Sequence, residues 1–518
     1  MGIAGSFPSQ ATRKDGATPN PRAAFFALSP TNLGNCKDGD GQKAVGSASP
    51  ACLAALALLL LTGCAPNLGA PPVIQPPANY QTTKSFSAPA AVWPEESWWK
   101  AYGDPQLDGL IEEALAGSPD LKMAAARVRA TEAMADISEA MLWPTVVGDA
   151  TAMEVKMPQN LGFPAAFSAF MPKGYHNAAL VTASIQYQLD LFGKNRAAFN
   201  AALSTAEAAK AEQSEARLQI STGVATTYVV LMQLFVDKAM ADDAVNVRRQ
   251  SADLVEQRFK AGLENEASLS QARAQLEAAK VQAQVVDSYI ERTRHGLAVL
   301  LGKGPDYGLS IVPAKAHPLR SGGLPVSLAA DLIGRRPDIV AARRNAEAAA
   351  EGIEEANANF YPNVDLTGLY GLGTLDAKLL LKSSSVVAGF GPAIHLPIFD
   401  YGRNTGIYRA SRAKYDAAVA LYDKTLTNAL RDVADAYTNR RALEGELTHA
   451  HASLAESENA YRVIRVRYDA GLARYLDVLA VENLLLVQRT AVADLEAQAF
   501  ACDIALVRAL GGGYVENK

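Results

Sequence analysis

Two similar hexapeptides stand 209 residues apart, Arg258-Phe259-Lys260-Ala261-Gly262-Leu263 and Arg467-Tyr468-Asp469-Ala470-Gly471-Leu472. Each closes a stretch of nearly seventy residues without proline, 194–261 and 403–470. A helix of that length would span about 100 Å, far more than the helices of ordinary globular domains. Glycine suits the left-handed residue that ends a helix, with the following leucine packing back on it. The sequence therefore predicts two very long helices, each followed by a tight turn.

The chain is internally duplicated. Pro119-Asp120-Leu121 returns as Pro337-Asp338-Ile339 at an offset of 218, and Gly193-Lys194-Asn195 returns as Gly402-Arg403-Asn404 at an offset of 209. A length change confined to one interval marks a loop or hairpin between rigid elements. Two copies are too few for a solenoid. We predict a first repeat at 105–312, a linker at 313–326 in the equatorial region (the middle of the long helices), a second repeat at 327–512 and a C-terminal tail at 513–518.

Each repeat reads as a helix, a strand pair, a very long helix and a long helix. The first helices are expected at 105–142 and 327–360, and the returning helices of the hairpins at 266–301 and 475–510. Between them, apolar and polar side chains alternate, as at 181–190 and 363–370. This alternation is typical of a barrel strand with lipid on one face and water on the other, although a half-buried soluble sheet shows it too. Because lipid does not tolerate open strand edges, two hairpins per chain would need strands from other chains.

The N-terminal region reads as a targeting segment. Residues 51–63 are uncharged and apolar, too short to span a bilayer as a helix but suited to a signal peptide. They end in Leu61-Thr62-Gly63-Cys64, which resembles the lipobox of bacterial lipoproteins, where the cysteine thiol receives a diacylglyceryl group. We predict a signal peptide at 1–63 with an over-extended N-terminus, and a lipidated, proline-rich extended tether at 64–104.

Composition excludes several classes of protein. A net charge of −5 argues against nucleic-acid binding. An apolar fraction of 49% with 20% charged residues excludes both a disordered chain and a polytopic helical membrane protein. The sequence contains no HExxH, CxxC, GxSxG or phosphate-loop pattern, and its six histidines form no cluster. We therefore expect no enzymatic activity, no cofactor and no metal site.

Several motifs in collinear order carry a family resemblance: Trp98-Trp99, Asp104-Pro105-Gln106-Leu107, Asp190-Leu191-Phe192-Gly193, Arg335-Arg336-Pro337-Asp338-Ile339 and Pro397-Ile398-Phe399-Asp400-Tyr401-Gly402-Arg403. With the lipobox and the two hexapeptides, they resemble the TolC-like outer-membrane efflux proteins, lipoprotein branch. The resemblance implies a mixed α+β membrane protein that forms a homotrimer. Four strands per chain would form one 12-stranded β-barrel, which a long α-helical barrel continues through the periplasm.

The resemblance also implies working residues at the hairpin turns, in the periplasmic mouth of the duct. Arg467, Tyr468 and Asp477 occupy positions where the family places polar groups around the closed gate. Asp477 would form a ring of carboxylates in a trimer, or would simply cap the returning helix. Ala480 stands where a second acidic gate residue can occur, and Ser268 occupies the first-repeat position equivalent to Asp477. The expected adaptor-docking tips are Gly262, Leu263, Gly471 and Leu472.

The implied function is a passive outer-membrane exit channel that receives substrates from an inner-membrane resistance-nodulation-division (RND) transporter through a periplasmic adaptor. An alternative is the outer-membrane channel of a type I protein secretion system driven by an ABC transporter. A different class of protein remains open, a periplasmic coiled-coil scaffold lipoprotein without a pore.

Overall fold

The computed structural model describes residues 66–76, 79–158, 172–314, 323–325 and 328–516. The chain separates into two units, residues 1–60 and 61–518, and all the elements named below belong to the second. The predicted signal peptide at 1–63 and the predicted lipidation site Cys64 lie outside the described residues.

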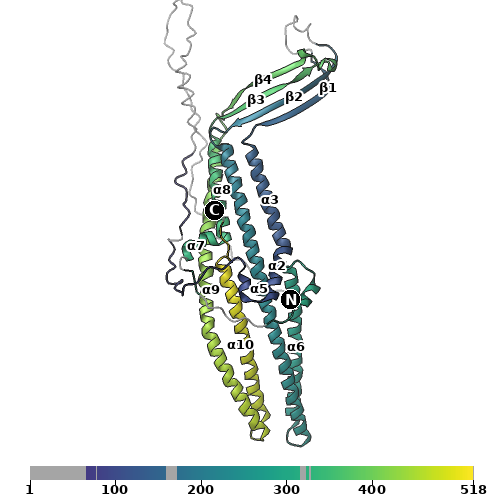
Figure 1. Cartoon of the computed structure of the whole chain (residues 1–518), viewed down its shortest axis with the longest axis vertical. Coiled ribbons are helices and arrows are strands. Elements are labelled where there is room, and N and C mark those ends of the chain that lie inside the picture. Colours follow the sequence, from purple (N-terminus) through teal and green to yellow (C-terminus); the bar gives the residue numbers. More distant parts are fainter. Residues whose placement is uncertain (1–65, 77–78, 159–171, 315–322, 326–327, 517–518) are drawn as a thin grey trace, which may run out of the picture. The chain divides into compact units, whose positions relative to one another are not determined.

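Two long helical hairpins pack against each other through α5 and α10 (Figure 1). The first consists of α5 (Lys194–Lys260) and α6 (Glu266–Leu300), and the second of α9 (Arg403–Asp469) and α10 (Tyr475–Ala509). The helices α5 and α9 have 67 residues each, so both are about 100 Å long. Every bound of the first hairpin recurs 209 positions later in the second. The predicted hairpins and their offset are therefore confirmed.

Both hairpin turns close with the same hydrogen bonds. The N–H of each glycine, Gly262 and Gly471, donates to the carbonyl three residues back, and the N–H of the next leucine donates to the carbonyl five residues back, at 2.8–3.0 Å. The two glycines have φ of 74° and 73°, which side chains other than glycine rarely adopt. The expectation that the leucines pack back is wrong. Leu263 and Leu472 are 66% and 71% exposed, because the backbone alone completes the helix end.

The first helix of each repeat is divided, contrary to the prediction of one helix. The helices α2 (Pro105–Gly117) and α3 (Pro119–Ala140) form the first pair, and α7 (Leu328–Arg335) and α8 (Pro337–Ala358) form the second. Proline lacks an N–H and disfavours helical geometry in the residue before it. Accordingly, Ser118 and Arg336 have ψ of 127° and 120°, outside the helical range. Each proline then starts the next helix, where its missing donor costs nothing.

The four strands form one antiparallel sheet in the order β1 (Thr145–Lys156), β2 (Tyr175–Leu189), β3 (Asn363–Thr374), β4 (Val386–His395). The register aligns the apolar positions of all four strands: Val146, Ile185, Gly368 and Phe390 follow one another across the sheet. Gly371 permits the pairing of β2 with β3, because a Cβ there would lie 2.2 Å from the Val181 carbonyl oxygen. One face of the sheet is therefore apolar, as the alternation predicts, and much of that face is exposed in the single chain.

Two equivalent cores lie where the short helices pack on the long ones. In the first, Leu107 and Ile111 of α2 are buried with Tyr228 of α5, beside Trp98 and Trp99. In the second, buried residues of α7 and α8 pack on α9. Trp98 and Trp99, which lie inside the segment predicted as tether, therefore belong to the first core.

Of the described helices, only α5 contains a stretch long and apolar enough to cross a bilayer, and 44% of that stretch is buried within the chain.

Candidate functional site

The predicted gate residues lie near the second hairpin turn, in different surroundings. Tyr468 is buried, with its ring centroid 6.3 Å from that of Tyr475 and 4.9 Å from the guanidinium carbon of Arg258. Burial raises the pKa of Tyr468, and the Arg258 charge opposes that shift. Because Arg258 belongs to α5, Tyr468 joins the two hairpins. Arg467 is exposed at the last turn of α9.

Asp477 closes the start of α10. The N–H of Arg474 donates to Asp477 Oδ2 at 2.9 Å, and the Arg474 guanidinium lies 3.4 Å from Asp477 Oδ1. The bond from the Arg474 N–H lowers the pKa of Asp477. In the first repeat Ser268 occupies the equivalent position, and its N–H donates to the capping residue Asn265. In the single chain Asp477 therefore caps the start of α10, the second of its two predicted roles.

A buried ion pair joins the two hairpins close to their turns. Arg248 of α5 and Glu482 of α10 are both buried, and Nη1 and Oε1 lie 3.0 Å apart. Asn483 accepts a further hydrogen bond from Arg248. Burial raises the pKa of Glu482, and Arg248 opposes that shift. Sequence reasoning missed this pair, although an acidic residue inside the apolar run 478–487 was a signal that could have found it.

The junction between sheet and helices repeats one device twice. The Asn404 amide donates to the carbonyl of Asn359 at 2.9 Å, and Asn195 donates to the carbonyl of Met141 at 3.2 Å. Each acceptor stands directly after the helix that precedes the sheet, α8 or α3. The asparagine of the repeated Gly-Lys-Asn and Gly-Arg-Asn motifs thus ties the start of a long helix to the end of the preceding one.

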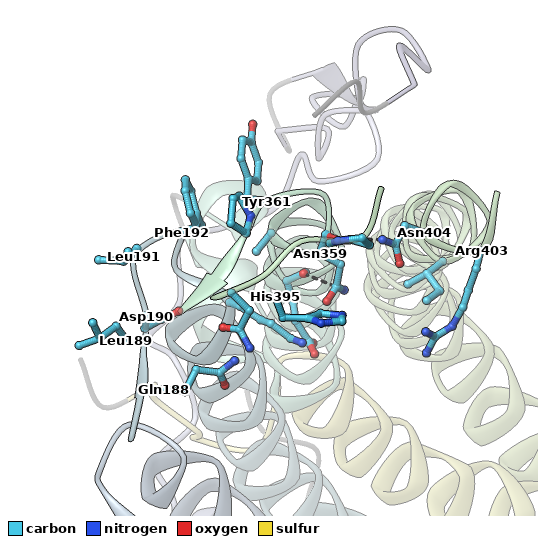
Figure 2. Close-up of a pocket in the computed structure, with 17 residues that line it drawn as sticks. Gln188, Leu189, Asp190, Leu191, Phe192, Asn359, Tyr361, His395, Arg403 and Asn404 are labelled. Carbon is cyan, nitrogen blue, oxygen red and sulfur yellow. Dashed lines mark hydrogen bonds between the residues drawn. The ribbon is translucent and has the colours of Figure 1, made fainter. Parts of the chain in front are cut away.

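Figure 2 shows the pocket of about 450 Å³ at this junction, lined by polar and aromatic side chains of both repeats. Phe192, which follows β2, stacks on Tyr361, which precedes β3, with centroids 4.7 Å apart and planes inclined by 13°. His395 and Arg403 also line the pocket. The repeats are therefore joined here by a ring stack as well as by the pairing of β2 with β3.

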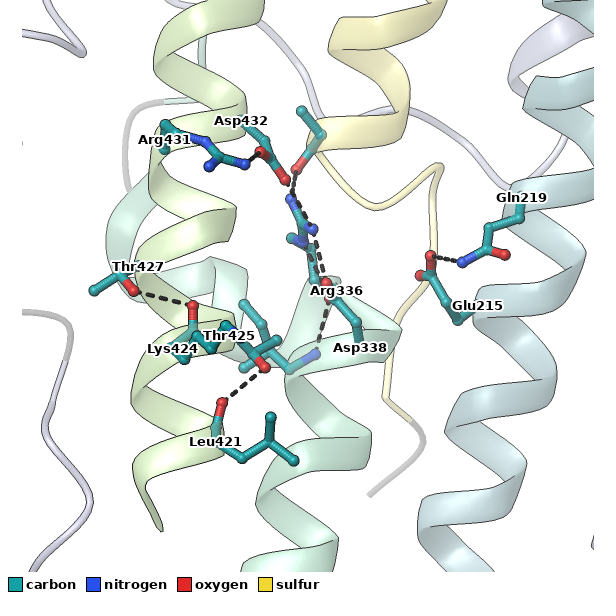
Figure 3. Close-up of polar contacts among 12 residues, drawn as sticks. Glu215, Gln219, Arg336, Asp338, Leu421, Lys424, Thr425, Thr427, Arg431 and Asp432 are labelled. Atoms are coloured by element: carbon teal, nitrogen blue, oxygen red, sulfur yellow. Dashed lines mark hydrogen bonds and ion pairs between the residues drawn. The ribbon is translucent and has the colours of Figure 1, made fainter. Parts of the chain in front are cut away.

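The equatorial region is held by Arg336, at the start of α8 (Figure 3). Its guanidinium binds both carboxylate oxygens of Asp338, at 3.0 and 2.7 Å, and donates to the Ala509 carbonyl at 3.1 Å. Burial lowers the pKa of Arg336, but Asp338 and two further carboxylates raise it above its usual value. Since Ala509 ends α10, this arginine joins the beginning of the second repeat to its end.

Metal-binding clusters and reactive thiols were sought among the described residues. Among them, no group of three or more His, Cys, Asp or Glu side chains could hold a metal ion. Cys502 is partly buried, and burial raises the pKa of its thiol, so it is a poor nucleophile.

Comparisons with known proteins match both repeats. The family model described as "Outer membrane efflux protein" matches residues 110–303 and 328–512. The fusaric acid resistance protein FusA of Burkholderia cepacia is 35% identical over 333 residues, which is 62% of either chain. The multidrug resistance outer membrane protein MdtP of Escherichia coli K12 is 29% identical over 469 residues, 88% of this chain and 94% of MdtP.

A solved structure agrees. The outer membrane protein VceC of Vibrio cholerae is 38% identical, with a TM-score of 0.77, covering 81% of this chain and all of VceC. The sequence resemblance to outer-membrane efflux proteins is thereby confirmed. With its duplicated hairpins, its four-stranded sheet and a family match over both repeats, this chain belongs to the outer membrane efflux protein family, and it serves as an exit channel for efflux.

Proposed function

We propose that three copies of this chain form one passive outer-membrane channel, to which a periplasmic adaptor and an inner-membrane RND transporter deliver substrates. The observation that carries the proposal is the sheet. The strands β1 and β4 pair on one side only, and one sheet face is apolar and exposed. A sheet with open edges cannot stand in lipid, so it must close with other copies. Three copies of four strands give a barrel of 3 × 4 = 12.

The helices would then continue the barrel as a hollow duct. Where α5 meets α8, Ala211 is buried together with Ala341, and small residues let helices pack closely enough to form a wall. The proposal assigns no catalytic step and no nucleotide to the chain. The transporter would supply the energy, and the substrates would pass through the duct passively.

The described part of the tether supports lipidation at Cys64. Going back along the chain, Gln75 contacts Asp423 of α9, and the carbonyl of Ala70 accepts from Arg412, nearer the start of α9 and the sheet. The tether thus runs toward the membrane end of the helix. Cys64 stands six residues before Ala70, and six extended residues span at most about 20 Å. The start of α9 lies nine residues before Arg412, about 14 Å along the helix, so an acyl chain on Cys64 would reach the membrane surface.

We assign the tips Gly262, Leu263, Gly471 and Leu472 to adaptor docking. Both leucines are exposed although apolar, and no backbone requirement keeps a leucine there. Three exposed copies of each would present an apolar rim to a partner.

We assign the closed gate to Arg467, Tyr468 and Asp477. Asp477→Asn separates gating from capping, because the asparagine side-chain oxygen still accepts the Arg474 N–H but carries no charge. If the carboxylate ring closes the pore, this variant conducts more than the wild type in a planar bilayer. Unchanged conductance of the asparagine variant, with a change only in Asp477→Ala, would leave Asp477 a capping residue.

Native mass spectrometry with single-channel recording of the purified protein tests the proposal as a whole. We expect a trimer that conducts once the gate is loosened. A chain that never conducts, even as Asp477→Ala, would be the pore-less scaffold. Photo-crosslinking from Leu472 in cells then identifies the partners: an adaptor with an RND transporter supports the proposal, and an adaptor with an ABC exporter would indicate type I secretion.

A further inference from the structure

We infer that the base of the barrel is sealed between copies by an aromatic contact, in which Phe399 and Tyr401 of one copy pack on Trp143 of the next. This inference rests on the proposed trimer and specifies its interface. The chain already contains the corresponding contact once, between its own repeats.

The internal contact is the stack of Phe192 on Tyr361 (Figure 2). Phe192 belongs to the segment between β2 and α5 of the first repeat, and Tyr361 to the segment between α8 and β3 of the second. At the same place β2 pairs with β3, and α5 packs on α8. The surface of the first repeat formed by β2, Phe192 and α5 therefore packs against the surface of the second repeat formed by α8, Tyr361 and β3.

Among the residues that the structure describes, the counterparts of these two rings do not stack on each other. At the offset of 209, Phe192 corresponds to Tyr401, and at the offset of 218, Tyr361 corresponds to Trp143. Tyr401 is 92% exposed, its neighbour Phe399 is 84% exposed, and Trp143 is 67% exposed. Phe399 and Tyr401 contact each other edge to face, with centroids 6.4 Å apart. Large aromatic side chains left in this state indicate a missing partner surface.

The strand order brings these surfaces together. Trp143 stands two residues before β1, and Tyr401 stands six residues after β4. The strands β1 and β4 are the two edges of the sheet, and they run in opposite directions. When β4 of one copy pairs with β1 of the next, the end of β4 lies beside the start of β1. Closing the barrel therefore places Tyr401 near Trp143 of the next copy, just as the pairing of β2 with β3 places Phe192 near Tyr361 within one chain.

The helices give an independent indication. Ala341 of α8 is buried together with Ala211 of α5. Their counterparts are Met123 of α3 and Ala420 of α9, and both are exposed in the single chain. Met134, Ile137 and Met141 are also exposed, at the spacing of one helix face. The exposed apolar stripe on α3 therefore corresponds to a surface that α9 of another copy would cover, below the aromatic contact. A lipid surface would cover the rings but would not account for Met123, which lies five turns of helix away from Met141.

Crosslinking tests the contact. In a Cys502→Ser background, Trp143→Cys is combined with Tyr401→Cys, and membranes are treated with a short bis-maleimide. We expect covalent trimers on denaturing gels, absent from either single-cysteine chain. The internal pair Phe192→Cys with Tyr361→Cys is the matched control, because it must link within one chain without forming multimers. A second control combines Tyr401→Cys with Leu381→Cys, which lies in the segment between β3 and β4, at the opposite end of the strands.

The possible failures are distinguishable. If native mass spectrometry still finds a trimer and the internal pair links, but the Trp143–Tyr401 pair does not, the inference is wrong and the proposed channel stands. Quenching of Trp143 fluorescence by brominated phospholipid in the intact trimer would show that lipid occupies this surface, and would also overturn the inference; Trp143→Phe supplies the background. Absence of any trimer would count against the proposed function itself.

Discussion

The ion pair of Arg248 with Glu482 provides a sharp test of how the two hairpins are held together. Both side chains are buried, with 3.0 Å between Nη1 and Oε1. Removing one partner of a buried pair leaves an uncompensated charge and costs about 3–5 kcal/mol, whereas replacing both by apolar residues is about neutral. We expect Arg248→Met and Glu482→Leu each to destabilise the packing of α5 on α10, and the double variant to restore most of it.

The two single variants should differ in their pH dependence. Burial raises the pKa of Glu482, and Arg248→Met removes the charge that opposes this shift. A pKa raised in the folded state gives stability that is complete below the unfolded value, about 4.3, and is lost as the pH rises through the folded value. The Arg248→Met chain should therefore weaken with rising pH, by at most about 1.4 kcal/mol per pH unit. The Glu482→Leu chain should not, because arginine stays charged throughout this range.

Hydrogen exchange of the α10 amides, followed by mass spectrometry at about pH 5 and about pH 8 and corrected for intrinsic exchange, measures the local opening free energy. The matched control is Arg273→Met, since Arg273 occupies the position of Glu482 in the first repeat and forms an exposed pair with Glu256; it should leave exchange unchanged. Equal pH dependence of the two single variants, or a double variant as unstable as either, would refute the reasoning.

Three further predictions concern the sheet, the junction and the tail. Gly371→Ala should abolish trimer formation, seen on semi-native gels, because its Cβ would lie 2.2 Å from the Val181 carbonyl oxygen, whereas Gly389→Ala meets no atom within 4 Å and should assemble normally. Asn404→Ala should lower the free energy of unfolding by about 1 kcal/mol, read as a lower melting temperature, since the Asn359 carbonyl loses its donor. Glu516→Gln should cost about 2 kcal/mol, because Glu516 accepts from two arginines of α8. Burial raises the pKa of Glu516, but the two arginines lower it by more, so the pKa in the folded chain is below its usual value. The stabilisation by Glu516 is therefore complete above the unfolded pKa and is lost as the pH falls through the folded pKa. In the Gln variant the melting temperature should depend less on acid pH.

The parts of this fold that depend on local chemistry were predictable from the sequence. A proline-free run and a glycine in the left-handed region determine where α5 and α9 begin and end, and alternation determines which strand face is apolar. The division of the first helices is equally local, since Pro119 and Pro337 are visible in the sequence, although one helix was predicted across each of them. The Arg248–Glu482 pair was not predictable in the same way, because its partners are 234 residues apart and depend on how the hairpins pack.

The duplicated hexapeptides show where local reasoning ends. Phe259 and Tyr468 stand at equivalent positions of equivalent turns, yet Phe259 is 38% exposed and Tyr468 is buried under Arg258. The two hexapeptide sequences alone do not predict this difference. It arises because Arg258 of the first hairpin covers Tyr468, and the reverse contact does not exist in one chain. The same asymmetry makes the duplication informative once a structure is available. In the proposed trimer, every buried contact from the first repeat to the second specifies a pair of positions that a neighbouring copy would cover. The exposed apolar side chains of Trp143, Met123 and Tyr401 stand at such positions.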